Sequence, residues 1–201
     1  MPSAIAHSSV ALALGSLLPR TTLPRWVWLL GAGCAALPDL DVITFRLGIS
    51  YGSVFGHRGL THSIAFALMV ALIIALLGAW LSKRHRFLPT LFIFVFACTM
   101  SHGLLDAMTD GGRGVALLAP FNNDRYFLPW RPIAVSPLTV TRFFTVAGMR
   151  VIASEVMWVM VPSSLIALMA SSLRSSLARS QYEAAGLGMG LQSKTSPDGQ
   201  S

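Results

Sequence analysis

The feature that most constrains this chain is the run Ile64–Leu81, which holds eighteen consecutive uncharged residues and is almost entirely apolar. A run of this length is typical of a transmembrane helix, because the backbone of a lipid-exposed segment must satisfy its own hydrogen bonds. Charged residues make up only 11% of the chain, against roughly 25% in an average soluble domain. The sequence therefore predicts a protein that crosses a membrane several times.

Four further apolar segments are predicted to be helical: 4–18, 26–37, 87–105 and 151–173. Short basic turns, one with Arg20 and Arg25 and one over 82–86, join the first three of these and Ile64–Leu81 into two helical hairpins. The last segment carries Glu155, and we expect Pro162 to interrupt it, since proline removes a helical hydrogen bond. The predicted fold is all-α, a polytopic membrane helical bundle of about four to five helical segments.

The net charge of +7 comes from Lys and Arg residues at the ends of apolar segments. This placement is typical of residues that orient a membrane protein, with basic turns in the cytoplasm, and does not indicate nucleic-acid binding. Cys34 and Cys98 lie within apolar segments, so we interpret them as packing residues. We expect residues 1–175 to form one membrane-embedded domain and the polar residues 176–201 to form a disordered tail.

Polar residues cluster where the predicted spans begin or end, and there they include most of the histidines of the chain. The clusters contain His7, Asp39, Asp41, His57, His62, His102 and Asp106. The two predicted hairpins place these residues at one face of the bundle. Because polar side chains without partners are costly in hydrocarbon, such clusters indicate a functional site.

Imidazole and carboxylate groups in this pattern are candidate metal ligands. His102 and Asp106 are four residues apart and share a helix face, although they could instead form a hydrogen-bonded pair at a helix end. Asp39 and Asp41 follow Pro38 and could face one cation, bridge two, or form a solvated helix end. The lone His7 could equally be a buried histidine with a local partner. Seven nitrogen and oxygen ligands exceed the needs of one tetrahedral zinc and would suit a two-metal site. We expect one or two divalent ions per chain, with zinc as the first choice.

The stretch Gly56-His57-Arg58-Gly59-Leu60-Thr61-His62-Ser63 immediately precedes the span Ile64–Leu81. Its histidines, five apart around Gly59, fit a turn that leads into a helix, where each could bind metal or be an interfacial residue. Arg58 could hold an anionic group such as phosphate, or extend to the membrane surface. Asp110 precedes two glycines and is either a further ligand or a turn residue.

These motifs resemble a known family. The early His7, Pro38-Asp39-Leu40-Asp41, His57-Arg58-Gly59-Leu60-Thr61-His62-Ser63, His102 with Leu105-Asp106, and Thr109-Asp110-Gly111-Gly112 leading to Ala119-Pro120-Phe121 are similar to the LexA-regulated, inner-membrane metal-dependent hydrolases of bacteria. The likeness covers residues 1 to about 150. It implies a multi-pass protein of the bacterial inner membrane, with a divalent-metal site and a hydrolase activity.

Two classes of function follow from these observations. The first is a membrane-bound metal-dependent hydrolase acting on a phosphoester or lipid-linked ester at the bilayer surface, with Arg58 holding the anionic group. The second is a non-catalytic membrane protein in which the metal stabilises the fold, or an ion transporter. A transporter would place ionisable groups near the middle of the membrane, whereas these lie at span ends.

Overall fold

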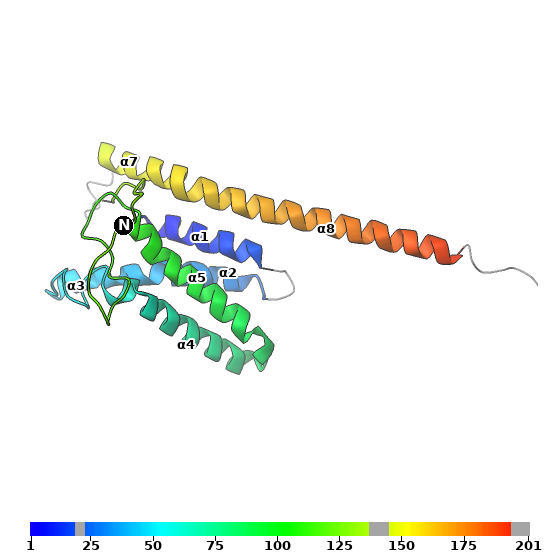
Figure 1. The fold of residues 1–201 in the computed structure, drawn as a ribbon, viewed down its shortest axis with the longest axis horizontal. Coiled ribbons are helices and arrows are strands. Elements are labelled where there is room, and N and C mark those ends of the chain that lie inside the picture. Colours follow the sequence, from blue (N-terminus) through cyan, green and yellow to red (C-terminus); the bar gives the residue numbers. More distant parts are fainter. Residues whose placement is uncertain (19–22, 137–144, 194–201) are drawn as a thin grey trace, which may run out of the picture.

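The computed structural model describes residues 1–18, 23–136 and 145–193, and within them the protein is helical, with no strand (Figure 1). This confirms the predicted all-α class. The elements are α1 (Ala4–Leu17), α2 (Trp26–Ala36), η1 (Leu37–Val42), α3 (Ile43–Arg46), η2 (Leu60–His62), α4 (Ile64–Ser82), η3 (His85–Phe87), α5 (Leu88–Ala107), α7 (Val146–Glu155), η4 (Val156–Met160) and α8 (Val161–Ser193).

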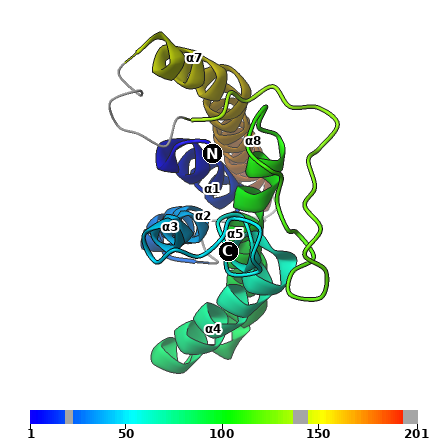
Figure 2. The ribbon, with the colours of Figure 1, turned by 90° about the vertical axis from the view of Figure 1, so that its left-hand side faces the viewer.

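Four helical stretches among the described residues are long and apolar enough to cross a membrane: Trp26–Arg46, Ile64–Ser82, His85–Ala107 and Val146–Ala178. The 19 residues of α4 rise about 28 Å, close to the ~30 Å thickness of the hydrocarbon core. Helix α1 is apolar but shorter. It packs against α2, α5 and α8, while α4 packs against α5 (Figures 1 and 2).

Small side chains let these helices approach one another closely. Ala67, Ala71, Ala75 and Ala79 recur every four residues along α4, and all four are buried. Small residues at such spacing are typical of helix interfaces in membranes, where packing rather than hydrophobic transfer drives association. The other side of α4 exposes large apolar residues such as Leu72, Ile73 and Leu76, as expected of a surface that faces lipid.

Pro162 was expected to interrupt the last helical stretch, but the stretch continues through it. The residues before this proline form a π-helical turn over Val156–Met160, in which the N–H of Val161 donates to the carbonyl of Val156. Such a turn already departs from the α-helical bonding pattern that proline cannot complete. Helix α8 then continues to Ser193, so residues 176–193 of the predicted tail are helical, and 194–201 lie outside the described residues.

The two hairpins bring four helix ends to one end of the molecule: the start of α1, the end of α2, the start of α4 and the end of α5 (Figure 1). The loops 47–59 and 108–136 lie at this end as well (Figure 2). Backbone pairing of Thr109 with Ile133 and of Val115 with Tyr126 holds the second loop together. The polar clusters therefore meet under a cover of loops.

Candidate metal centre

Four side chains from three elements converge at this end. Asp39 comes from η1, His62 from η2, and His102 and Asp106 from the last turns of α5. One ligand atom from each lies within 4.8 Å of the others, and His62, His102 and Asp106 are buried. His102 Nε2 lies 3.2 Å from Asp39 Oδ1 and 3.0 Å from His62 Nε2, which lies 3.2 Å from Asp106 Oδ2. These residues could hold a metal ion.

The tautomers of the two histidines follow from their other ring nitrogens. His102 Nδ1 lies 2.6 Å from the carbonyl oxygen of Ala35, which only accepts, so this nitrogen must donate a proton. His62 Nδ1 lies 3.2 Å from Asp41 Oδ2 and donates to that carboxylate. In the neutral rings both Nε2 atoms then carry lone pairs that face each other and two carboxylates. Such an arrangement requires a cation or a proton between them.

The carbonyl that orients His102 belongs to Ala35, in the last turn of α2. The 3-10 helix that follows begins at Leu37 and contains Pro38, which has no N–H to donate to the Ala35 carbonyl three residues earlier. The contact between Ala35 and His102 joins α2 to α5 and was not predicted from the sequence.

Asp41 is not one of the four converging side chains but contacts one of them, His62. Residues 37–42 form a 3-10 helix with three residues per turn, so Asp39 and Asp41 point in directions about 120° apart. Asp41 Oδ1 accepts from His57 Nδ1, while Oδ2 accepts from Thr61 Oγ1 at 2.6 Å and from the N–H of Arg58 at 3.1 Å. With His62 as its fourth partner, Asp41 orients a candidate ligand and does not face the same point as Asp39.

His57 and His7 also lie outside the group of four. His57 is buried against Asp41 and packs its ring edge-on to that of Tyr51, with 5.6 Å between the centroids. His7, from α1, stacks on His102 with centroids 3.7 Å apart and the planes at 13°. Neither ring nitrogen of His7 has a hydrogen-bond partner among the described residues. His7 is therefore the remaining donor beside the centre.

Arg58 was expected to hold an anionic group, but its side chain is buried beside Asp106. Its side chain is only 1% exposed, and its Nε lies 3.0 Å from Asp106 Oδ2. Its Nη1 donates to Thr109 Oγ1 and to the carbonyl of Gly111. A positive φ of 60° turns the backbone at Arg58, a conformation that non-glycine residues adopt at few positions. The guanidinium supports Asp106 from within the protein.

Gly112 leaves the space that this guanidinium occupies. A Cβ atom at Gly112 would lie 2.7 Å from Nη1 of Arg58, and its φ of +93° also disfavours a side chain. Thr109 and Gly112 are thus parts of the site to which sequence reasoning assigned no chemical role. Asp110 accepts from the N–H of Val135 and lies away from the centre, as a turn residue would.

The donor set fits a divalent cation. Asp39, Asp41 and Asp106 carry three negative charges against one positive charge on Arg58, which leaves a formal −2 with neutral histidines. Tetrahedral zinc with bonds of ~2.0–2.1 Å separates neighbouring ligand atoms by about 3.3 Å. Three of the observed separations are 3.0, 3.2 and 3.2 Å, and that between His62 Nε2 and Asp39 Oδ1 is 3.9 Å. Asp106 is fully buried, and its Oδ2 lies 3.0 Å from Arg58 Nε and 3.2 Å from His62 Nε2.

Without a metal, the same charges act on His62. Burial alone lowers its pKa, but hydrogen bonds to Asp106 and Asp41 outweigh burial and raise the pKa to about 9. A proton on Nε2 would satisfy the contact with Asp106. It would leave His102 Nε2 facing Asp39, whereas one cation among the four atoms satisfies every contact.

Comparison with known proteins identifies the family. The model of the YdjM inner membrane protein family matches residues 1–178. The chain belongs to this family. It is also 41% identical over 167 residues to the inner membrane protein YbcI of Escherichia coli strain K12, an alignment that covers 83% of this chain and 95% of YbcI. No solved structure matches the chain.

Family membership confirms the predicted location and fits the resemblance drawn from the motifs, as far as both describe an inner-membrane family. The chain is an inner-membrane protein with four candidate spans among its described residues. The match of the family model includes all seven candidate ligands and extends past residue 150, into the last helical stretch.

Proposed function

We propose that this protein is a membrane-bound metal-dependent hydrolase whose ion, zinc as first choice, is held by Asp39, His62, His102 and Asp106. One observation carries the proposal: four electron-pair donors converge in a largely buried site where the second ring nitrogens of both histidines are already oriented by other groups. Metal-binding histidines usually donate their other N–H to a carbonyl or carboxylate. His102 and His62 do so, to Ala35 and Asp41.

A divalent metal in such a site would lower the pKa of a bound water and polarise the scissile group. Asp41 and the Ala35 carbonyl would keep the Nε2 atoms of His62 and His102 aimed at the ion. Arg58 would hold Asp106 and balance its charge. The side chain of Asp39 is 16% exposed, more than those of the other three, and would lie on the accessible side. A second ion would require His7 as a further donor.

A phosphoester or lipid-linked ester is the substrate class that suits this position. The site lies at the ends of α2 and α5 and the start of α4, which places it near the depth of lipid head groups. Ester and phosphate groups of membrane lipids occupy the same depth.

A structural metal site is the second candidate, because the centre is closed. The side chains of His62, His102 and Asp106 are 0% exposed, and catalytic metals keep one position open whereas structural metals do not. In that case the metal would stabilise the contacts among η1, η2 and α5 without supporting hydrolysis.

Metal analysis of purified protein, combined with a screen of phosphoester and carboxylic ester substrates, tests the proposal. We expect stoichiometric metal in the wild type, and its loss in His102→Ala and Asp106→Asn. His85→Ala, at an exposed histidine of η3, is the matched control and should retain metal. Hydrolysis that stops with chelation and returns with metal supports the enzyme. Retained metal with no hydrolysis supports the structural site, and a metal-free wild type contradicts both.

A further inference from the structure

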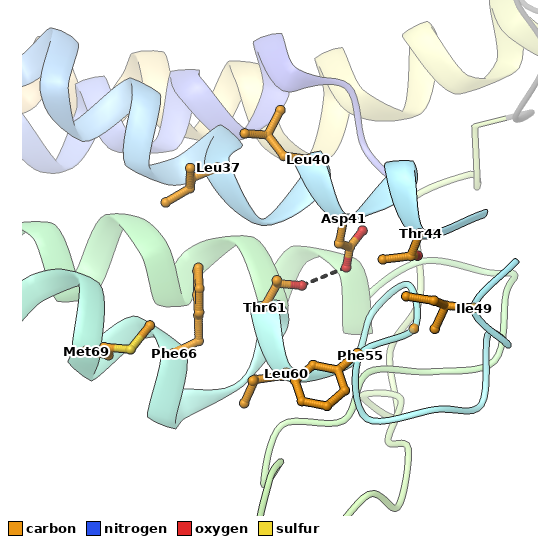
Figure 3. Close-up of a pocket in the computed structure, with 11 residues that line it drawn as sticks. Leu37, Leu40, Asp41, Thr44, Ile49, Phe55, Leu60, Thr61, Phe66 and Met69 are labelled. Carbon is orange, nitrogen blue, oxygen red and sulfur yellow. Dashed lines mark hydrogen bonds between the residues drawn. The ribbon is translucent and has the colours of Figure 1, made fainter. Parts of the chain in front are cut away.

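An apolar pocket (Figure 3) is lined in part by Asp41, whose carboxylate contacts the candidate ligand His62. Its volume is about 530 Å³, within the ~300–1,000 Å³ range of small-molecule sites. Its walls come from η1, the loop 47–59, η2 and the first turns of α4. The apolar residues that shape it include Leu37, Leu40, Ile49, Phe55, Phe66 and Met69.

Three polar side chains line the pocket: Asp41, Thr44 from α3, and Thr61. Asp41 and Thr61 have hydrogen-bond partners, whereas the Thr44 hydroxyl has none among the described residues. Thr61 donates to Asp41 across the pocket wall (Figure 3), and both oxygens of Asp41 accept hydrogen bonds. Within the part of the chain that the structure describes, no Lys or Arg lines the pocket. A charged or strongly polar ligand would therefore lose its hydration here and find a single free hydroxyl, that of Thr44, among the described residues. The lining selects an apolar occupant.

The pocket is continuous with the surface that faces lipid. Met69 is 49% exposed, and Ile73, one turn further along α4, is 56% exposed. Leu40 and Phe55, on the other walls, are 67% and 65% exposed. A chain from the bilayer can thus enter sideways between α4 and η1.

The Asp41–Thr61 hydrogen bond connects the pocket to the metal centre. Asp41 Oδ2 lies 3.2 Å from Nδ1 of His62, whose Nε2 belongs to the converging group. Phe66 and Met69 lie deeper along α4 than Thr61 (Figure 3). A lipid whose chain lay against these two residues would have its linkage region at the level of Asp41 and Thr61.

We propose that this pocket binds one hydrocarbon chain of a membrane lipid, with the ester or phosphoester linkage of that lipid beside the metal centre. The assignment rests on the proposed hydrolase and narrows its substrate from phosphoesters in general to chain-bearing lipids. Lipid tails are as apolar as the pocket, so occupancy depends on close packing and not on transfer from water. A bulky residue in the pocket should therefore exclude the chain.

Photo-crosslinking in lipid nanodiscs tests this assignment. The discs contain phosphatidylethanolamine, phosphatidylglycerol and a trace of phosphatidylglycerol with a diazirine on one acyl chain, and labelled peptides are mapped by mass spectrometry. We expect labelling within 37–49 and 60–69 in the wild type, and its loss in Met69→Trp. Ile73→Trp, on the same face but outside the pocket, is the matched control and should keep the labelling. Leu40→Trp, on the opposite wall, replaces Met69→Trp if that variant does not fold.

Equal labelling in Met69→Trp and Ile73→Trp would overturn the proposal. So would loss of labelling upon adding excess glycerol 3-phosphate, since a soluble head group would then be the ligand. His102→Ala separates the two proposals, because it removes a metal ligand and leaves the pocket intact. Chain labelling that persists in this variant supports the pocket whatever the hydrolysis screen shows, and labelling lost together with the metal contradicts a separate chain site.

Discussion

His62 and its two neighbours, Thr61 and Ser63, make different kinds of contact. The Nδ1 of His62 faces Asp41 and its Nε2 faces His102 and Asp106. One ring therefore connects Asp41 to the other candidate ligands. The neighbouring Ser63 has a separate role as the N-cap of α4, accepting from the N–H of Phe66 at 3.1 Å. Thr61 donates to Asp41 instead. Three adjacent residues thus have three roles: Thr61 hydrogen-bonds Asp41, His62 is a candidate ligand, and Ser63 caps α4.

Gly103→Ala should disturb the centre without changing a ligand. A Cβ atom at Gly103 would lie 2.6 Å from the carbonyl oxygen of His62, so α5 and η2 would have to separate. We expect metal affinity to fall about 10–100-fold, the usual effect of losing a supporting contact, measured by competition with a chelator. Gly33→Ala is the control, since a Cβ atom added there would meet no atom of another described segment within 4 Å. It should be neutral or stabilise by up to ~1 kcal/mol, and equal effects of the two changes would contradict the prediction.

Metal affinity should weaken in acid. With the pKa of His62 raised to about 9 in the metal-free protein, a proton occupies this histidine at neutral pH and must leave before Nε2 can bind metal. Affinity is then greatest above this pKa and falls about tenfold for each pH unit below it. Titration calorimetry in buffers of different ionisation enthalpy would count the released proton. Affinity that does not change between neutral and alkaline pH would exclude His62 as a ligand.

At the scale of elements, a buried carboxylate connects the first helix to the last helical stretch. Glu155, the final residue of α7, is 3% exposed. Its two oxygens accept from the N–H and the hydroxyl of Ser3, each at 2.6 Å. Ser3 is also the N-cap of α1, accepting from the N–H of Ala6. Since α1 carries His7, this contact fixes the helix that packs over the metal centre.

Ser3→Ala and Glu155→Ala should each lower the free energy of unfolding by about 1–3 kcal/mol, because each leaves a buried polar group without its partner. The double variant should lose less than the sum, since the residues share one interaction. Thermal unfolding in detergent would measure the cycle. Ser175→Ala, at an exposed serine that donates only within α8, should change little. Additive losses would show that Ser3 and Glu155 act independently.

At the scale of the whole molecule, the basic turn between α4 and α5 lies at the end opposite to the metal centre. This turn contains Lys83, Arg84 and Arg86. The other predicted basic turn includes Arg20, which lies outside the described residues, and Arg25. Lys and Arg in short loops favour the cytoplasmic side. The metal centre would then face the periplasm.

Cysteine labelling tests this orientation. Cys34 and Cys98 are both buried and can be replaced by alanine to give a background without cysteine. We expect Ser82→Cys, in the basic turn, to be protected in intact cells from a reagent that passes the outer membrane only. Asn122→Cys, exposed in the loop at the other end, should react. The reverse pattern would place the centre in the cytoplasm.

The sequence by itself determined the spans, the hairpins and the candidate residues. Long uncharged runs such as Ile64–Leu81 permit few structures in hydrocarbon, because each backbone group must find its partner within the segment. Once α4 and α5 form a hairpin, the stretch before one and the end of the other must be neighbours. For the same reason His102 and Asp106, four apart on a helix, share a face in the structure as expected.

Tertiary structure decided which candidates converge. Asp39 and Asp41 separate because Pro38 begins a turn with a period of three rather than 3.6 residues. Arg58 points inward because its backbone turns at positive φ and because Gly112 leaves room for its guanidinium. His7 reaches His102 only through the packing of α1 on α5. Spacing in a sequence specifies a shared face only when the local backbone geometry is known, and here contacts between distant segments set that geometry.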